Sequence, residues 1–231
     1  MRTPELRRRR AVPVAVSLLV AAAAVAASYS PIFAARDLRI ASPPVPRGEV
    51  LALAGIDRGT NVFHLDTGEV ERRLEADPRV LEATVTTSLP SSLRIAITPR
   101  RPVAVAGSPA ALIGADGIAI GPVGSTTSEL PILRGDDLRL AASAAAAMSP
   151  ALRRAVEAIA IRPDGGISVR LEVGFTADLG APSELPAKAA SLAAILRWAT
   201  AEGVRVVSAD VTVPGSPTAR LADGETAVPS G

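Results

Sequence analysis

Two runs in which apolar and polar residues alternate stand out in the middle of the chain, separated by the segment Ser88-Leu-Pro-Ser-Ser92. Alternation with a period of two predicts half-buried strands, and the proline–serine segment predicts the turn of a hairpin. The apolar positions are Leu81, Ala83 and Val85 in the first run and Leu93, Ile95 and Ile97 in the second. Each strand therefore has one apolar face that another element must cover.

Two short helical patterns before this hairpin supply the cover. In the first, at residues 47–54, apolar residues share one helical face and Gly55 follows as a stop signal. In the second, Asp66 and Glu69 have the spacing of a capping box. The residues expected to face the strands are Val50, Leu53, Ala54, Val70 and Leu74. With a strand-like segment beginning at Arg36, the order strand, helix, helix, strand, strand predicts a small α+β layer.

The pattern after Ala106 indicates a second, mixed α/β unit. A hairpin is expected around residues 115–117, and Gly174 is expected in a turn or bulge with positive φ. Helices are expected at 136–148, 151–159 and 186–201, and strands at 167–174, 175–180, 204–213 and 218–222. Residues 223–231 are expected to form a disordered tail.

The N-terminal segment is of a different kind. No charged residue occurs from Ala11 to Ala35, directly after four consecutive arginines. A run of about 20 apolar residues can cross the hydrocarbon core as a helix, and arginines before it hold that end in the cytoplasm. We therefore expect a transmembrane helix at 11–33, with Tyr29 and Phe33 at the outer interface. The topology-setting residues are Arg7, Arg8, Arg9 and Arg10. A cleaved signal peptide is the alternative, because Ala24-Val25-Ala26 resembles a small-x-small processing site.

Composition and charge exclude several classes of protein. The chain has no cysteine, so it offers no disulfide, no thiol nucleophile and no thiolate metal site. The net charge is +2, but the first ten residues carry five arginines against one glutamate, which leaves −2 for the other 221. A folded part without a basic excess does not indicate a nucleic-acid binder. Aromatic residues make up only 2% of the chain, so its cores are built from Ala, Val, Leu and Ile.

Few residues could carry catalysis. His64 is the only histidine, and its place before the Asp66 cap favours a structural role over a catalytic triad or zinc site. The carboxylate pairs Asp136–Asp137 and Glu69–Glu71 could serve a glycosidase. Both pairs lie where helices are expected to begin, however, and a favourable interaction with the helix dipole explains acidic residues there without catalysis. Trp198 is the only tryptophan available for stacking on a sugar. We expect no enzyme, no cofactor, no metal and no small-molecule substrate.

Four segments resemble the FtsQ/DivIB family of cell-division proteins. They are GIDRGTNVFHLD at 55–66, ADPRVLEATVTTSLPSSLRIAITPRRPVAV at 76–105, LEVGFTADLG at 171–180 together with Lys188, and ADVTVP at 209–214. The second is the most specific, because family members carry similar proline–valine, proline–serine and arginine–proline pairs there. One departure is Arg79, where the family often has an aromatic residue. The resemblance covers residues 7–222.

The resemblance implies a domain order and a role. It implies a cytoplasmic basic stub (1–10), the transmembrane helix (11–33), a POTRA domain of β-α-α-β-β order (36–105) and a mixed α/β "β domain" with a largely antiparallel sheet (106–222). It also implies a single-pass plasma-membrane protein of the divisome, enriched at the septum, with its C-terminal domains outside the cytoplasm. In the family, the last helix and strands of the β domain bind the FtsB component of the FtsB–FtsL pair, and the POTRA domain acts in recruitment.

The residues themselves point to the same region, because an edge strand can accept a strand from a partner. Carried over from the resemblance, the expected partner-binding residues are Val211, Val213, Ser216, Thr218, Ala219, Arg220 and Leu221. Arg100–Pro102 is either a second partner or anion patch or a solvated strand end. Two other functions stay open: an anchored or secreted cell-wall enzyme or glycan-binding protein, and a POTRA-bearing export factor. The export factor would continue into a long β-barrel sequence, which this chain does not contain.

Overall fold

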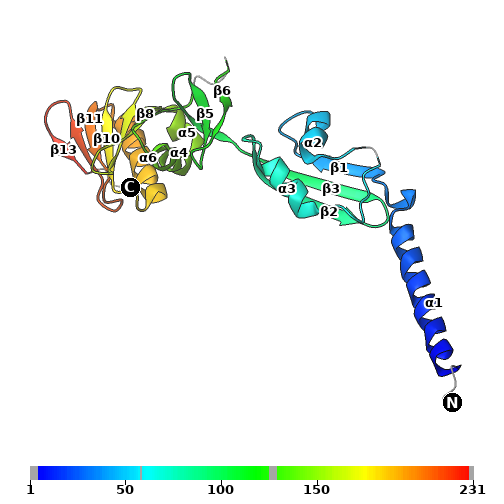
Figure 1. The fold of residues 1–231 in the computed structure, drawn as a ribbon. Helices are drawn as coiled ribbons and strands as arrows, with labels where there is room; N and C mark the ends of the chain where they lie inside the picture. Colours follow the sequence, from blue (N-terminus) through cyan, green and yellow to red (C-terminus); the bar gives the residue numbers. More distant parts are fainter. Residues whose placement is uncertain (1–4, 58, 125–128, 229–231) are drawn as a thin grey trace. The chain divides into compact units, whose positions relative to one another are not determined.

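The computed structural model describes residues 5–57, 59–124 and 129–228, with side chains from residue 16 onward. The chain divides into two compact units, Met1–Pro99 and Arg100–Gly231 (Figure 1). The first unit contains α1 (Glu5–Ser28), a short 3-10 helix η1 (Pro31–Phe33), β1 (Asp37–Ala41), α2 (Arg47–Ala54), α3 (Thr67–Glu75), β2 (Val80–Ser88) and β3 (Ser92–Pro99). The predicted order of strand, helix, helix, strand, strand is confirmed for residues 37–99.

The N-terminal segment is helical over residues 5–28. No helix in the described part of the chain has the length and hydropathy that crossing a membrane requires. The expected topology-setting residues Arg7–Arg10 lie within α1, and their side chains fall outside the described ones.

The three-stranded sheet of the first unit has the order β1-β3-β2, with β1 parallel and β2 antiparallel to β3. Helix α3 begins as the sequence predicts, because the Asp66 carboxylate accepts a hydrogen bond from the backbone N–H of Glu69 at 3.0 Å. Helix α2 ends at Gly55, which has a φ of 66° that glycine adopts without strain. Both helices bury apolar residues against the sheet, including Val50, Val70 and Leu74.

One strand position was predicted wrongly. Leu81 was expected to face the core, but it is 50% exposed, and Val80 is buried in its place. The pairing of β2 with β3 shifts register between Val80 and Glu82, so the inward and outward positions exchange there. From Ala83 onward the predicted alternation is correct.

The second unit is built around one ten-stranded sheet of order β13-β12-β11-β10-β9-β8-β7-β4-β5-β6. Its strands are β4 (Pro102–Ala106), β5 (Ala111–Gly114), β6 (Ala119–Pro122), β7 (Ile132–Arg134), β8 (Val156–Ile161), β9 (Ile167–Leu171), β10 (Thr176–Gly180), β11 (Val206–Asp210), β12 (Thr218–Leu221) and β13 (Thr226–Ala227). Its helices are α4 (Leu138–Ala147), α5 (Pro150–Arg154) and α6 (Leu185–Glu202). The sheet is largely antiparallel, as expected; the parallel pairs are β4–β7, β7–β8 and β10–β11. Gly174 lies in the β9–β10 turn with a φ of 90°.

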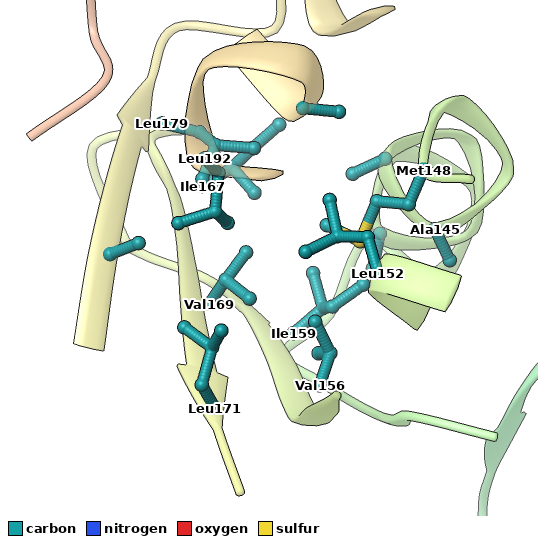
Figure 2. Packing of buried hydrophobic residues seen from close by; sticks show 14 of the residues in the cluster. Ala145, Met148, Leu152, Val156, Ile159, Ile167, Val169, Leu171, Leu179 and Leu192 are labelled. Carbon is teal, nitrogen blue, oxygen red and sulfur yellow. The ribbon is translucent and has the colours of Figure 1, made fainter. Parts of the chain in front are cut away.

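The three helices share one hydrophobic core with alternate residues of the strands. Figure 2 shows Ala145, Met148 and Leu152, from α4, its end and α5, packed toward residues of β8 and β9. Because period-two strands place alternate residues on opposite faces, the other face of the sheet is left to polar side chains. These include Ser168 and Arg170 of β9 and Thr176 and Asp178 of β10.

Two predicted boundaries differ from the structure. The helix expected at 151–159 ends at Arg154, and Val156–Ile161 forms strand β8 instead. The strand lies between β7 and β9: Ile159 pairs with Leu133 of β7 and with β9, and Val156 and Ile161 pair with β9. This pairing of β-branched residues outweighs their helical spacing. The first unit ends at Pro99, not at 105, because residues 102–106 form β4 of the large sheet.

The C-terminal end differs from expectation as well. The strand expected at 204–213 is confined to β11, because Asp210 accepts hydrogen bonds from the backbone N–H and hydroxyl of Thr212 and the chain turns there. Within the expected disordered tail, Thr226 and Ala227 form β13, paired with Arg220 and Ala219 of β12. The turn between them is closed by the Leu221 N–H donating to the Glu225 carbonyl. Residues 229–231 of the expected tail lie outside the described residues.

Candidate partner-binding site

The C-terminal end of the large sheet carries the residues that the sequence singles out for partner binding. Strand β11 is parallel to β10 and antiparallel to β12, with Ser208 opposite Arg220 and Asp210 opposite Thr218. The loop from Val211 to Pro217 is fixed at two points: the Val211 N–H donates to the Asp178 carbonyl at 2.9 Å, and the Ser191 hydroxyl donates to the Pro214 carbonyl at 2.8 Å. This region is therefore ordered around α6 and β10.

The seven expected residues do not all lie on the surface. Val211 and Ala219 are fully buried in the core of the second unit, so they support the region and cannot contact a partner. Val213 is 60% exposed, and Ser216 and Arg220 are also exposed. Thr218 and Leu221 are half-buried, and Leu221 packs against the core. Val213, Ser216 and Arg220 are thus the exposed members of the set, and half-buried Thr218 lines one hollow together with Arg220.

Arg220 borders a shallow polar hollow of about 350 Å³ on the face of the sheet opposite the helices. The hollow is lined by Thr176, Asp178, Ser208, Ala209, Asp210, Thr218, Arg220 and Thr226. Asp178 accepts a 2.6 Å hydrogen bond from Arg162, and this bond, with a second to Asp164, raises the pKa of the Arg162 guanidinium. In the described part of the chain Arg220 itself has no ion-pair partner, so its charge is available to an acidic group of a partner.

A second, apolar hollow lies beside the end of α6, and sequence reasoning missed it. It measures about 320 Å³ and is lined by Val173, Phe175, Leu196, Ala199, Thr200, Gly203, Val204, Arg205 and Val206. Phe175 is buried at its base, and Val173 of the β9–β10 turn is exposed at its rim. The signal in the sequence was an apolar residue, Val173, directly before the turn glycine Gly174. The hollow has the character of a site for an apolar side chain.

Most of the groups that the sequence offered for catalysis make contacts within the fold. The hydroxyl of Ser28 lies 2.9 Å from Nε2 of His64, and the ring of Tyr29 stacks on the imidazole at 4.5 Å. Asp137 caps α4 by accepting from the Leu140 N–H, and Glu71 accepts from the Val85 N–H at 2.7 Å. Glu69 pairs with Arg72 and Arg73, and the hydrogen bond from Arg72 lowers the pKa of that carboxyl.

The remaining candidates are similarly placed. Among the described residues no three His, Asp or Glu side chains gather as metal ligands would. Trp198 is half-buried against the core of the second unit. Arg100, considered as part of a partner patch, is largely buried and donates to Asp116 at 2.9 Å, which helps to hold the pKa of Asp116 below its usual range despite the opposing effect of burial. Arg101 stays exposed.

Comparison with known proteins agrees with this architecture. A family model described as a POTRA domain of the FtsQ type matches residues 44–100, which includes α2, α3, β2 and β3. The cell division protein FtsQ of Mycolicibacterium smegmatis is 30% identical over 215 residues, which cover 89% of this chain and 62% of the relative. FtsQ of Mycobacteroides abscessus is 28% identical over 177 residues, covering 73% of this chain and 57% of the relative.

A third relative matches a shorter segment. FtsQ of Koribacter versatilis is 37% identical over 93 residues, which cover 38% of this chain and 27% of that protein. The chain thus spans less than two thirds of the length of each of these relatives. Residues 44–100 are thus a POTRA domain of the FtsQ type, and across both units the chain is similar to FtsQ cell-division proteins.

Proposed function

We propose that the chain is a bitopic membrane scaffold of the bacterial divisome that docks FtsB- and FtsL-type proteins during septum formation. Similarity to FtsQ cell-division proteins supports the role in division. The uncharged run from Ala11 to Ala35, directly after four arginines, supports a plasma-membrane anchor with a cytoplasmic N-terminus. Both folded units would then be extracytoplasmic. One anchor confines partners to a plane and raises their effective concentration, so modest contacts suffice.

The observation that carries the docking role is the C-terminal edge of the large sheet. The sheet ends in β13, which pairs with only two residues of β12, so this edge offers backbone N–H and C=O groups to an incoming strand. Arg220 would supply a charge-assisted contact, and Val213 an apolar one. The apolar hollow beside α6 would receive a side chain of the same partner. In this arrangement Val211 and Ala219 hold the edge in place from the core.

The experiment that tests the docking role is site-specific photo-crosslinking in growing cells. A photoreactive residue replaces Thr218, and the matched control replaces Ala119, an exposed residue of β6 at the opposite end of the same sheet. We expect position 218, and not position 119, to capture a small single-span protein at septa. Equal capture from both positions, or none from 218 at normal expression, would remove the C-terminal edge as the docking site.

The same experiment addresses the alternative of a cell-wall enzyme or glycan-binding protein. Such a protein would yield adducts with wall glycan in place of a protein adduct. Mass spectrometry of the captured material distinguishes these products, because a glycan adduct carries amino-sugar fragments. Glycan adducts from position 218 would refute the proposed scaffold role and support a glycan-binding role.

A further inference from the structure

A cluster of four ring side chains, with Ile32 beside them in the sequence, lies where α1 meets the POTRA domain. Tyr29, Ile32 and Phe33 follow the helix, and Phe63 and His64 belong to the loop before α3; we call these five residues the junction patch. The rings of Phe33 and Phe63 lie 5.3 Å apart, and those of Phe63 and His64 5.1 Å apart. The chain has one tyrosine and three phenylalanines, so the patch takes most of them. Because the chain has so few aromatic residues, their grouping at this one place needs a structural or functional explanation.

The patch is held in place by the backbone. The Val62 N–H donates to the Phe33 carbonyl at 2.8 Å, and the Ala35 N–H donates to the Thr60 carbonyl at 2.9 Å. The side-chain amide of Asn61 donates to the Ser28 carbonyl, the last residue of α1, at 2.8 Å. These bonds tie the end of the helix to the POTRA loop, so Tyr29 and Phe63 keep a fixed relative position.

Packing does not explain the patch, because three of its members are largely exposed to solvent. Tyr29 is 68% exposed, Ile32 57% and Phe63 50%. Leu89 is also exposed, and it lies two residues before Ser91, whose carbonyl accepts from the Arg36 N–H. Three segments distant in sequence therefore meet at one end of the POTRA sheet, each with an exposed apolar side chain. Exposed apolar residues grouped in this way mark a binding surface.

We propose that the junction patch binds the interfacial layer of a lipid bilayer, so that the POTRA domain itself contacts the membrane through Phe63. The patch continues the exposed apolar surface of α1, which includes Leu18, Leu19 and Val25. Tyrosine and phenylalanine suit the headgroup boundary, where a ring meets both apolar and polar surroundings. Arg36 is exposed beside the patch and would attract anionic lipid headgroups. This inference rests on the proposed anchoring of α1.

A lipid surface fits better than a protein partner for two reasons. The patch is small, and it is continuous with helix α1. All side chains of α1 from Val16 to Val25 are exposed, and all of them except Ser17 are Val, Leu or Ala. A protein partner would have to cover both the helix and the loop, whereas a bilayer covers both without further contacts. The consequence is an orientation: the end of the POTRA sheet with the β2–β3 turn faces the membrane.

The test uses tryptophan as a reporter of depth in the full chain. Trp198→Phe removes the native signal, and Phe63→Trp in that background keeps an aromatic ring in the patch. The protein is reconstituted into vesicles of phosphatidylethanolamine and phosphatidylglycerol with lipids brominated near the headgroup end of the acyl chains. We expect emission from position 63 to shift to the blue and to be quenched several-fold more than emission from Leu81→Trp, an exposed control at the other end of β2.

A third reporter, Leu19→Trp in α1, separates this inference from the proposed function. If position 19 is quenched by lipids brominated deep in the chain but position 63 behaves like position 81, the anchor stands and the membrane contact of the POTRA domain is refuted. Quenching at both 63 and 19 supports both proposals, whereas quenching at 63 without quenching at 19 would refute the anchor and, with it, the inference as stated. If neither 19 nor 63 is quenched, both proposals are refuted.

Tyr29→Ser gives a second measurement on the same reporter. Tyr29 is exposed and makes no contribution to the POTRA core, so this variant keeps the fold. Removing its ring takes away part of the patch, and we expect the quenching of Phe63→Trp to fall. Undiminished quenching after this change would show that the patch does not act as a unit and would overturn its assignment.

Discussion

At the residue scale, Arg79 departs from the family pattern and forms ion pairs within the POTRA domain. Its guanidinium lies 2.6 Å from Glu49 of α2 and 2.6 Å from Asp77 in the turn before β2, so it joins two parts of the POTRA domain. We expect Arg79→Met to lower the free energy of unfolding by about 1 kcal/mol, since Arg79 is partly exposed and its bonds are screened. Urea unfolding measures this, with Arg72→Met as the exposed control expected to change little. Equal losses in both variants would contradict a special role for Arg79.

The same contact predicts a dependence on pH. Hydrogen bonds from Arg79 lower the pKa of Asp77 below its ordinary value of 3.8. A carboxyl with a lowered pKa in the folded state contributes stability above its unfolded pKa and loses it as the pH falls through the folded value. The stability difference between the native chain and Asp77→Asn should therefore be full at neutral pH and shrink below about pH 4. Thermal unfolding from pH 7 to pH 2 checks this; a gap that grows on acidification would refute it.

At the element scale, helix α3 closes the outer edge of β2. The carboxylates of Glu71 and Glu75 accept the N–H groups of Val85 and Ala83 at 2.7 and 3.0 Å. Those donors would otherwise be open to another chain. We expect Glu71→Ala to destabilise the fold by about 1–2 kcal/mol, because the N–H of a half-buried strand loses its acceptor, and to promote association. Glu71→Gln keeps an acceptor oxygen and is the control. Unfolding and light scattering should separate the two, and identical behaviour would remove the proposed edge protection.

These elements also show how far sequence patterns reach. The hairpin of β2 and β3 and the cap of α3 could be predicted, because period two and the Asp66–Glu69 spacing are local signals. The strand character of Val156–Ile161 could not, since residues with i, i+3 apolar spacing also fit a strand buried between two neighbours. Strand β13 is too short to carry a period, and only its pairing with β12 defines it.

The candidate site divides in the same way. The alternation of residues 204–213 predicts a strand near the C-terminus, and the use of that edge as a docking site stays a prediction. The burial of Val211 and Ala219 depends on which face α6 covers, and that is a property of the assembled sheet. The apolar hollow beside α6 is lined by residues from three separate segments, so the pattern of no single segment could predict it.

At the scale of the whole molecule, the two units treat their sheet edges differently. In the first unit, two carboxylates of α3 close the β2 edge. In the second unit, the edge of β12 is covered only by the two residues of β13, held by a turn in which the Gly224 N–H donates to the Leu221 carbonyl and the Glu225 N–H to Asp223. A short strand with few bonds is displaced at low cost. If the proposed docking role holds, this short strand is where a partner strand would enter the second unit.

This asymmetry predicts that β13 competes with the partner. Deleting residues 223–231 uncovers β12, and we expect the photo-crosslink yield from Thr218 to rise several-fold, because the partner no longer displaces a strand of the chain itself. Ala227→Pro in the full-length chain is the matched variant: it removes a backbone donor within β13 and should raise the yield in the same direction. Thermal unfolding should show that both variants keep the core, since Thr226 is exposed and Ala227 lies outside the hydrophobic cluster. A yield that falls in both would mean that β13 is part of the docking platform, and the partner strand would then pair with β13 instead of replacing it.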